Sequence, residues 1–212
     1  MAGESRDPPP YRIESDRLVI RCWAPADAPL LKDAIDTSLD HLRPWMPWAG
    51  DEPQPLDEKV ELLRRFRGMF DLGQDFVYGI FDRDESEVVG GTGLHTRLGD
   101  DAFEIGYWIR SSRLRRGLAT ETVTALTHVG FAVCEVDRIE IRVDPANEVS
   151  SRIPLRLGFV HEATLRRRLA PFGEKIGPRD ATVYTMFRTD FEHSPLARAR
   201  IRAFDGADNR LL

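Results

Sequence analysis

The stretch SRLRRGLATETV, residues 112–123, places three arginines before a glycine, a small residue and the start of a helix. The first backbone amides of a helix have no partner within the helix, and the helix macrodipole is positive at that end. Gly117 lets the backbone approach a ligand closely. The pattern therefore predicts an anion site, to which Arg113, Arg115 or Arg116 adds positive charge.

The composition of the whole chain limits the nature of its partners. The 212 residues carry a formal net charge of -5, which argues against nucleic acid as a specific partner, so an anion has to bind at a local site. The chain has no run of about 18 apolar residues and no apolar N-terminal leader, which predicts a cytoplasmic location and no membrane partner. Cys22 and Cys134 lie in apolar surroundings and are expected to be buried thiols. No metal site is expected.

The arginine-rich loop differs from two common phosphate-binding motifs. The dinucleotide fingerprint needs three spaced glycines, and the P-loop ends in Gly-Lys-Ser/Thr. Arginines before a helix also form solvated loops, so the loop by itself leaves both interpretations open. The surrounding elements have to decide between them.

Hydrophobic periodicity predicts an antiparallel meander before this loop and alternating helices and strands after it. Upstream we expect a strand at 17–23, helices at 25–35 and 60–70, and strands at 76–84, 87–98 and 102–110. Downstream we expect a helix at 117–133, a strand at 138–144, a helix at 150–157 that ends at Gly158, and strands at 159–168 and 181–188. The element order is therefore βααβββαβαββ.

This order divides the chain into three parts. We expect a flexible N-terminus over residues 1–10, one domain over 11–190 and a C-terminal extension over 191–212. The extension packs either on the domain or on the partner of a homodimer, and the sequence leaves both arrangements open.

Two segments together resemble the GNAT superfamily of N-acetyltransferases: RRGLAT after the meander, and NEVSSRIPLRLGF one strand later. The pyrophosphate loop of that superfamily has the form Q/R-x-x-G-x-G/A. Residues 114–119 supply its glycine and its small residue but place Leu114 at the first position, where Arg113 is a candidate substitute. Within the superfamily, HLRPWMPW, EIGYWI and IPLRLGF resemble the Rim-type (RimJ/RimL) ribosomal-protein N-acetyltransferases.

The resemblance covers residues 11–190 and implies both a fold and an activity. The fold is α/β (α+β), with a mixed, mainly antiparallel seven-stranded sheet flanked by helices and two central parallel strands that splay apart. The donor is acetyl-coenzyme A (acetyl-CoA), with another acyl-CoA left open. The acceptor is a primary amine, such as a protein N-terminus, and transfer is direct, in a ternary complex. A small-molecule amine acetyltransferase and a non-catalytic CoA-binding regulator remain as alternatives.

The resemblance also assigns the cofactor-binding residues. The backbone of Tyr107, Trp108 and Ile109 would pair with the pantetheine amide, and Asn147 would contact the pantetheine arm from the other side. An asparagine in this place is also a good helix N-cap. The pyrophosphate would be held by the backbone amides of Arg115, Arg116, Gly117, Leu118, Ala119 and Thr120.

Acetyl transfer needs a neutral amine, so a base has to remove a proton. Glu104, in the strand at 102–110, resembles the glutamate that serves as base in several members of the superfamily, and it is our first choice. Glu140 on the strand at 138–144 is the second. Both are also explained as strand-surface carboxylates that pair with Arg138 or Arg142.

The departing thiolate benefits from a nearby hydrogen-bond donor, although it can also leave without an enzymatic acid. Many members of the superfamily carry a tyrosine seven residues after the motif asparagine, but this chain has Pro154 there. Ser150, the hydroxyl proposed for this role in Rim-type relatives, is the best remaining candidate, although it also suits the start of a helix. Trp45 and Trp48 either line the acceptor cleft or pack the proline-rich loop that contains them.

Overall fold

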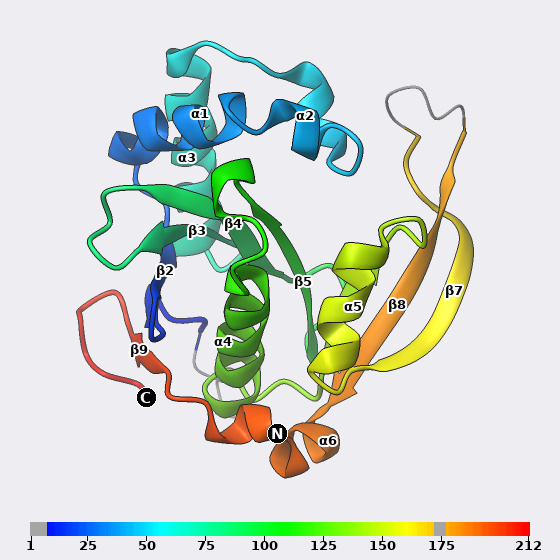
Figure 1. The fold of residues 1–212 in the computed structure, drawn as a ribbon. Helices are drawn as coiled ribbons and strands as arrows, with labels where there is room; N and C mark the ends of the chain where they lie inside the picture. The colour runs from blue at the N-terminus through cyan, green and yellow to red at the C-terminus, as the bar shows by residue number, and fades with distance from the viewer. Residues whose placement is uncertain (1–7, 172–176) are drawn as a thin grey trace.

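The computed structural model describes residues 8–171 and 177–212, which form helices around one nine-stranded mixed sheet (Figure 1). The strand order is β7-β8-β6-β5-β4-β3-β2-β1-β9. The strands are Arg12–Glu14 (β1), Leu18–Cys22 (β2), Phe76–Asp82 (β3), Val88–His95 (β4), Ala102–Ile109 (β5), Arg138–Val143 (β6), Val160–Leu169 (β7), Arg179–Phe187 (β8) and Arg202–Phe204 (β9). The α-helices are Ala28–Asp36 (α1), Leu39–Leu42 (α2), Leu56–Asp71 (α3), Leu118–Ala132 (α4), Glu148–Arg156 (α5) and Arg188–His193 (α6).

All seven predicted strands are present in the predicted order, but a sheet of seven strands was wrong because two more strands join it. The additional strands are β1 and β9, each three residues long, which pair with one another at one edge. Segments this short show no alternation that distinguishes them from loops. The short helices α2 and α6 were also not predicted.

The C-terminal extension packs on the rest of the chain. It contributes β9 to the sheet, and Phe191, Leu196 and Ala203 are buried in the main hydrophobic cluster. The Nδ1 atom of His128, a buried residue of α4, lies 2.9 Å from the carbonyl oxygen of Leu196. The last residues are therefore held by apolar burial as well as by strand pairing.

The sequence analysis expected residues 1–10 to be flexible, but the last residues of this segment are packed against the rest of the chain. Residues 1–7 lie outside the described part of the chain. Pro9 and Pro10 are buried, and the Tyr78 hydroxyl donates a hydrogen bond of 2.9 Å to the carbonyl of Pro10. Ordered packing thus begins before Tyr11, whereas the sequence analysis had it begin at Tyr11.

The two faces of the sheet are different in character. Alternation along β5 places Ile105 and Ile109 against α4, where they join a hydrophobic cluster with Val123 and Leu126. Helices α1 and α3 pack on the opposite face of β2, β3 and the start of β4, in a second cluster around Trp23. Side chains of β5 that point away from α4 therefore lie on the face that α1 and α3 cover in part.

The parallel pair predicted at the centre of the sheet is confirmed, and it is short. Strands β5 and β6 pair from Ala102 with Arg138 to Glu104 with Glu140, and their pairing ends there. Beyond this point β5 continues along β4, and β6 continues along β8. Each strand follows its outer neighbour, so the two strands part after the glutamates.

Three further observations bear on function. Cys22 and Cys134 are both buried, as expected. No helix in the described residues is long and apolar enough to cross a membrane. Within the same residues, no three or more His, Cys, Asp or Glu side chains gather in a way that could hold a metal ion.

Candidate active site

The loop between β5 and α4 has the backbone geometry of an anion site. Gly117 is the N-cap of α4 with φ of 76°, and Arg115 has φ of 58°, a region that side-chain-bearing residues seldom adopt. Strained backbone of this kind is typical of ligand-binding loops. The first i→i−4 bond of the helix joins the Glu121 amide to the Gly117 carbonyl, so the amides that precede it are available to a ligand. These are the amides of Leu118, Ala119 and Thr120.

Space around the loop is consistent with a bound phosphate. Arg115, Arg116 and Gly117 are exposed. A Cβ added at Gly117 would meet no heavy atom within 4 Å except Nη2 of Arg17, at 3.6 Å. The backbone here is therefore open to a close approach, and the predicted pyrophosphate residues lie together around it.

Arg17 is a cation at this loop that the sequence analysis missed. It lies between β1 and β2, and its Nη1 donates to the Arg116 carbonyl at 2.8 Å. Its Nε and Nη2 contact the Glu121 carboxylate at 2.7 and 2.6 Å, so the negative charge in the first turn of α4 is compensated. No local pattern marks Arg17, because it reaches the loop from about a hundred residues away in the chain.

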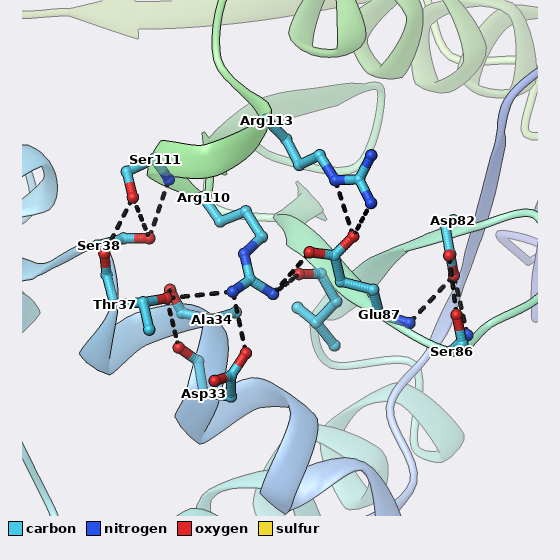
Figure 2. Close-up of polar contacts among 11 residues, drawn as sticks. Asp33, Ala34, Thr37, Ser38, Asp82, Ser86, Glu87, Arg110, Ser111 and Arg113 are labelled. Atoms are coloured by element: carbon cyan, nitrogen blue, oxygen red, sulfur yellow. Dashed lines mark hydrogen bonds and ion pairs between the residues drawn. The ribbon is translucent and has the colours of Figure 1, made fainter.

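Arg113 does not take the place that the sequence analysis gave it. Its Nε and Nη2 donate to the Glu87 carboxylate, away from the exposed backbone of the loop, as Figure 2 shows. The positive charge near the start of α4 therefore comes from Arg17, Arg115 and Arg116.

A network of polar contacts fixes the segment that leads into the loop (Figure 2). Buried Arg110 donates to the Asp33 carboxylate at 2.9 Å and lies 3.0 Å from Glu87. The Ser111 amide donates to the Ser38 hydroxyl at 2.9 Å, and the Ser111 hydroxyl donates to the Thr37 carbonyl. The end of α1 and the segment entering β4 thus hold the chain in place just before the loop.

The predicted pantetheine residues lie where β5 and β6 have separated. Tyr107, Trp108 and Ile109 pair with β4 on one side, whereas the pairing of β5 with β6 has already ended at Glu104. The backbone groups of β5 that face β6 in this stretch are available to an extended ligand, as in strand addition to a sheet edge.

Asn147 is the N-cap of α5, which is the structural role that the sequence analysis gave as the alternative to a contact with the pantetheine arm. Its side-chain oxygen accepts a hydrogen bond of 3.1 Å from the Ser150 amide. Ser150 is the third residue of this helix, and its hydroxyl oxygen lies 2.9 Å from that of Tyr107. Burial raises the pKa of Tyr107 to about 12, so its phenol stays protonated near neutral pH. The two hydroxyls link α5 to β5 across the place where the strands part.

Glu104 and Glu140 are register partners but have different surroundings. Glu140 accepts hydrogen bonds from Arg138 at 3.0 Å and from Arg142 at 3.1 Å, which is the structural alternative considered for it. Glu104 also pairs with arginines, including Arg142 as its own alternative predicted, but at longer range. Its Oε1 is 3.8 Å from Arg97, and its buried Oε2 is 3.6 Å from Nε of Arg142. At that distance Oε2 has an ion pair but no hydrogen-bond partner among the described residues. A buried carboxylate oxygen without a donor is rare, and it suits a group that receives a ligand's proton.

Trp48 brings the loop after α2 close to the same part of the sheet. Its ring makes an edge-on contact with Trp108, with centroids 5.8 Å apart, and it is 37% exposed. Trp108 packs partly against the cluster of α1 and α3. An exposed aromatic surface therefore borders the face of β5 that carries Glu104.

Comparison with known proteins identifies the family of the chain. Residues 17–160 match the family described as the acetyltransferase (GNAT) domain. The chain belongs to this family. GNAT enzymes are N-acetyltransferases that use acetyl-CoA as the donor, so the activity class and the donor inferred from the sequence are confirmed.

Two relatives and one solved structure illustrate the range of the GNAT family. YoaA of Bacillus subtilis (strain 168), an uncharacterized N-acetyltransferase, is 27% identical over 177 residues, which cover 83% of this chain and 96% of that protein. The [ribosomal protein uS5]-alanine N-acetyltransferase of Escherichia coli (strain K12) is 29% identical over 167 residues, covering 76% and 84%. The microcin C7 self-immunity acetyltransferase MccE, solved with acetyl-CoA and AMP, shares the fold with a TM-score of 0.73 at 17% identity, covering 82% of this chain and 93% of that one.

Proposed function

We propose that this GNAT enzyme transfers an acetyl group from acetyl-CoA directly to the N-terminal amine of a protein. The observation that carries the proposal is the end of the β5–β6 pairing at Glu104, where an opening between strands meets a carboxylate oxygen that makes no hydrogen bond and has only a 3.6 Å ion pair with Arg142. The donor would lie along β5 with its pyrophosphate at residues 115–120 and Asn147 near its pantetheine arm. The amine would approach from the face that bears Glu104.

The reaction converts R–NH3+ and acetyl-CoA into an acetylated amine, free CoA and one proton. The ammonium loses a first proton before its nitrogen can attack, and the nitrogen loses a second as the amide forms. One of these protons is returned to the thiolate, and the other goes to solvent. We assign Glu104 as the base that acts while the new C–N bond forms, and Glu140 as a structural carboxylate held by its arginines.

The leaving sulfur would be stabilised by Ser150. Because Tyr107 remains protonated, its hydroxyl can donate to the Ser150 oxygen and leave the serine hydrogen available to the sulfur. This arrangement replaces the hydroxyl that Pro154 removes from the usual position.

A protein acceptor is supported by two features. The relative from Escherichia coli acetylates an alanine of a ribosomal protein, as its name states. The exposed edge formed by Trp48 beside Trp108 offers apolar contact to the residues that follow a peptide N-terminus. We further propose that the enzyme works in the cytoplasm, where a ribosomal substrate and acetyl-CoA would both be present.

Two alternatives make different predictions. A small-molecule amine acetyltransferase would turn over polyamines, amino acids or aminoglycosides and ignore peptides. A CoA-binding regulator would bind acetyl-CoA but release no CoA with any amine. The departures at Leu114 and Pro154 are the features that favour the regulator.

The test is release of CoA from acetyl-CoA in the presence of a panel of N-terminal peptides, lysine-containing blocked peptides and small amines. We expect turnover with N-terminal peptides. Gly117→Asp is the matched control, because a carboxylate in the loop repels the pyrophosphate and should weaken acetyl-CoA binding at least about 100-fold in calorimetry. Binding without turnover of any amine would overturn the proposed function.

A further inference from the structure

A second acid–base pair, His95 with Asp75, lies beside Glu104. His95 is the last residue of β4, and its Nδ1 is 3.0 and 2.9 Å from the two carboxylate oxygens of Asp75. Both side chains are mostly buried, at 16% and 24% exposure. Neither residue belongs to a motif that the sequence analysis or the comparisons assigned.

The hydrogen bond to Asp75 determines which nitrogen of His95 is basic. A carboxylate accepts a hydrogen bond from Nδ1–H, so the neutral imidazole carries its lone pair on Nε2. Burial acts to raise the pKa of Asp75, but the hydrogen bond from His95 and the charges of His95 and Arg97 outweigh it, and that pKa lies below its ordinary value. Asp75 therefore remains ionised near neutral pH. None of the described residues forms a hydrogen bond with Nε2 of His95.

Two facing glycines provide the space in which the His95 ring lies. Gly93 on β4 and Gly106 on β5 are register partners. A Cβ at Gly93 would lie 2.8 Å from Nε2 of His95, and one at Gly106 would lie 3.3 Å from it. The ring therefore lies over the sheet next to Gly106, one residue before Tyr107, where β5 has already separated from β6.

The surroundings of His95 are charged and mixed in sign. His95 is the register partner of Glu104, so both side chains lie on the same face of neighbouring strands. The charged groups facing it are Asp75 before β3, Arg97 after β4, Glu104 on β5 and, beyond Glu104, Arg142 on β6. An ammonium between Glu104 and Nε2 of His95 would face a carboxylate whose charge Arg97 and Arg142 partly compensate, and a lone pair that no described residue occupies.

We propose that His95 removes the first proton from the acceptor ammonium, with Asp75 as its positioning residue, and that Glu104 removes the second as the C–N bond forms. This inference rests on the proposed function and assigns the two proton losses that the reaction requires. The proton taken up by Nε2 of His95 then passes to solvent, which returns the imidazole to its neutral form.

This division of roles favours one class of amine. An α-amino group has a pKa of about 7.7–8.0 and a lysine side chain about 10.4, so near neutral pH a lysine ammonium is roughly 300-fold harder to deprotonate. Near neutral pH the first proton is therefore much easier to remove from an α-ammonium than from a lysine ammonium. The site is matched to protein N-termini rather than to lysine side chains.

Steady-state kinetics of the full-length enzyme test the role of His95. With an N-terminal peptide at about pH 7, we expect His95→Gln to lower kcat/KM by at least about 100-fold without changing the KM for acetyl-CoA. Asp75→Asn should lower it by roughly 10-fold. The loss in both variants should shrink toward about pH 9, where the α-amine loses its proton to solvent. His193→Gln, an exposed histidine of α6, is the matched control and should behave as wild type.

Two measurements separate catalysis from structure. Added imidazole should restore part of the activity of His95→Ala, since the vacated space lies over Gly93 and Gly106. Nitrogen NMR of the unliganded wild type should report a protonated Nδ1 and an unprotonated Nε2 for His95. A folded His95→Ala variant that imidazole cannot rescue, or the opposite tautomer in the wild type, would overturn the proposal.

Failure of the role proposed for His95 can be told apart from failure of the proposed function. If the wild type turns over no amine, the proposed function fails, whereas the NMR result still decides whether His95 has the required tautomer. If the wild type acetylates peptides and His95→Gln keeps full kcat/KM and the preference for α-amines over lysine, only the role of His95 is overturned.

Discussion

The two ends of β5 place charged residues in opposite situations. Near its start, Glu104 has a buried oxygen without a hydrogen bond and two arginines at 3.6 and 3.8 Å. Just past its end, Arg110 uses both terminal nitrogens on Asp33 and Glu87, and Arg113 pairs with Glu87 as well (Figure 2). At the start of β5 a carboxylate oxygen is left without a hydrogen bond and could accept one from a ligand. Past the end of β5 the arginines are already paired with carboxylates and hold the segment before the predicted pyrophosphate loop. Substitutions at the start of β5 should therefore lower kcat, whereas substitutions past its end should lower Tm.

The largest effect is expected at the start of the strand. Glu104→Gln keeps the shape but removes the basicity, so kcat should fall by about 10²–10⁴-fold while calorimetric affinity for acetyl-CoA is unchanged. Glu140→Gln is the matched control and should lose less than about 3-fold in kcat, because its arginines already occupy it. If the control shows the large loss instead, the base has been assigned to the wrong strand.

Past the other end of β5, substitution of Arg110 should lower the stability of the protein. Arg110→Met removes a buried cation and leaves Glu87 and Asp33 without it, which should cost about 2 kcal/mol and lower Tm by about 4–8 °C. Activity at low temperature should stay within about 3-fold of wild type. Arg64→Met, at an exposed arginine of α3, is the control and should leave Tm nearly unchanged. An Arg110→Met protein with wild-type Tm would mean that the network contributes nothing to stability.

The middle of the strand should show a pH-dependent effect. Burial raises the pKa of Tyr107 from 10.0 to about 12, so its contribution to stability is complete below pH 10. Between pH 10.0 and about 12 the unfolded chain ionises first, and that contribution is lost. Urea unfolding across this window should show a steeper loss for wild type than for Tyr107→Phe. Parallel curves would indicate that Tyr107 ionises equally in both states. At neutral pH the same variant should lose roughly 10-fold in kcat, because Ser150 loses its partner.

The smallest effect tests the arginine that the loop does not use. Arg113→Ala should change the KM for acetyl-CoA by less than about 2-fold, because its guanidinium already pairs with Glu87. Arg17→Ala should raise that KM more, by about 5-fold, since it releases the Arg116 carbonyl and uncovers the Glu121 charge. A larger rise in this KM for Arg113→Ala than for Arg17→Ala would support the sequence prediction that Arg113 contributes to the pyrophosphate site.

Local signals account for what the sequence predicted correctly. Alternation gave the strands at 102–110 and 138–144, and the glycine after three arginines located the start of α4. The αL cap at Gly158 was also visible, with φ of 88°. Each of these features depends on residues within one or two turns of one another, which is the range that propensity and capping rules describe.

Contacts between distant segments were not visible in the same way. Strands β1 and β9 are too short to show a period. β1 pairs with both β2 and β9, and among the described residues β9 joins the sheet only through this contact between the two ends of the chain. Arg17 reaches the loop, and His95 reaches Asp75, without any motif at either position.

The sequence alone thus indicated the family, the element order and the loop that we predict to bind the pyrophosphate, because each rests on a short pattern whose chemistry is local. By resemblance it put Glu104 ahead of Glu140 as the base, but it could not say which arginines each carboxylate would meet. In the folded chain Glu140 accepts hydrogen bonds from two arginines of its own strand. Glu104 lies opposite His95, and its Oε2 has a 3.6 Å ion pair with Arg142 but no hydrogen bond. Which polar group remains unsatisfied depends on every neighbour that packing brings within hydrogen-bond distance, and only the folded chain specifies those neighbours.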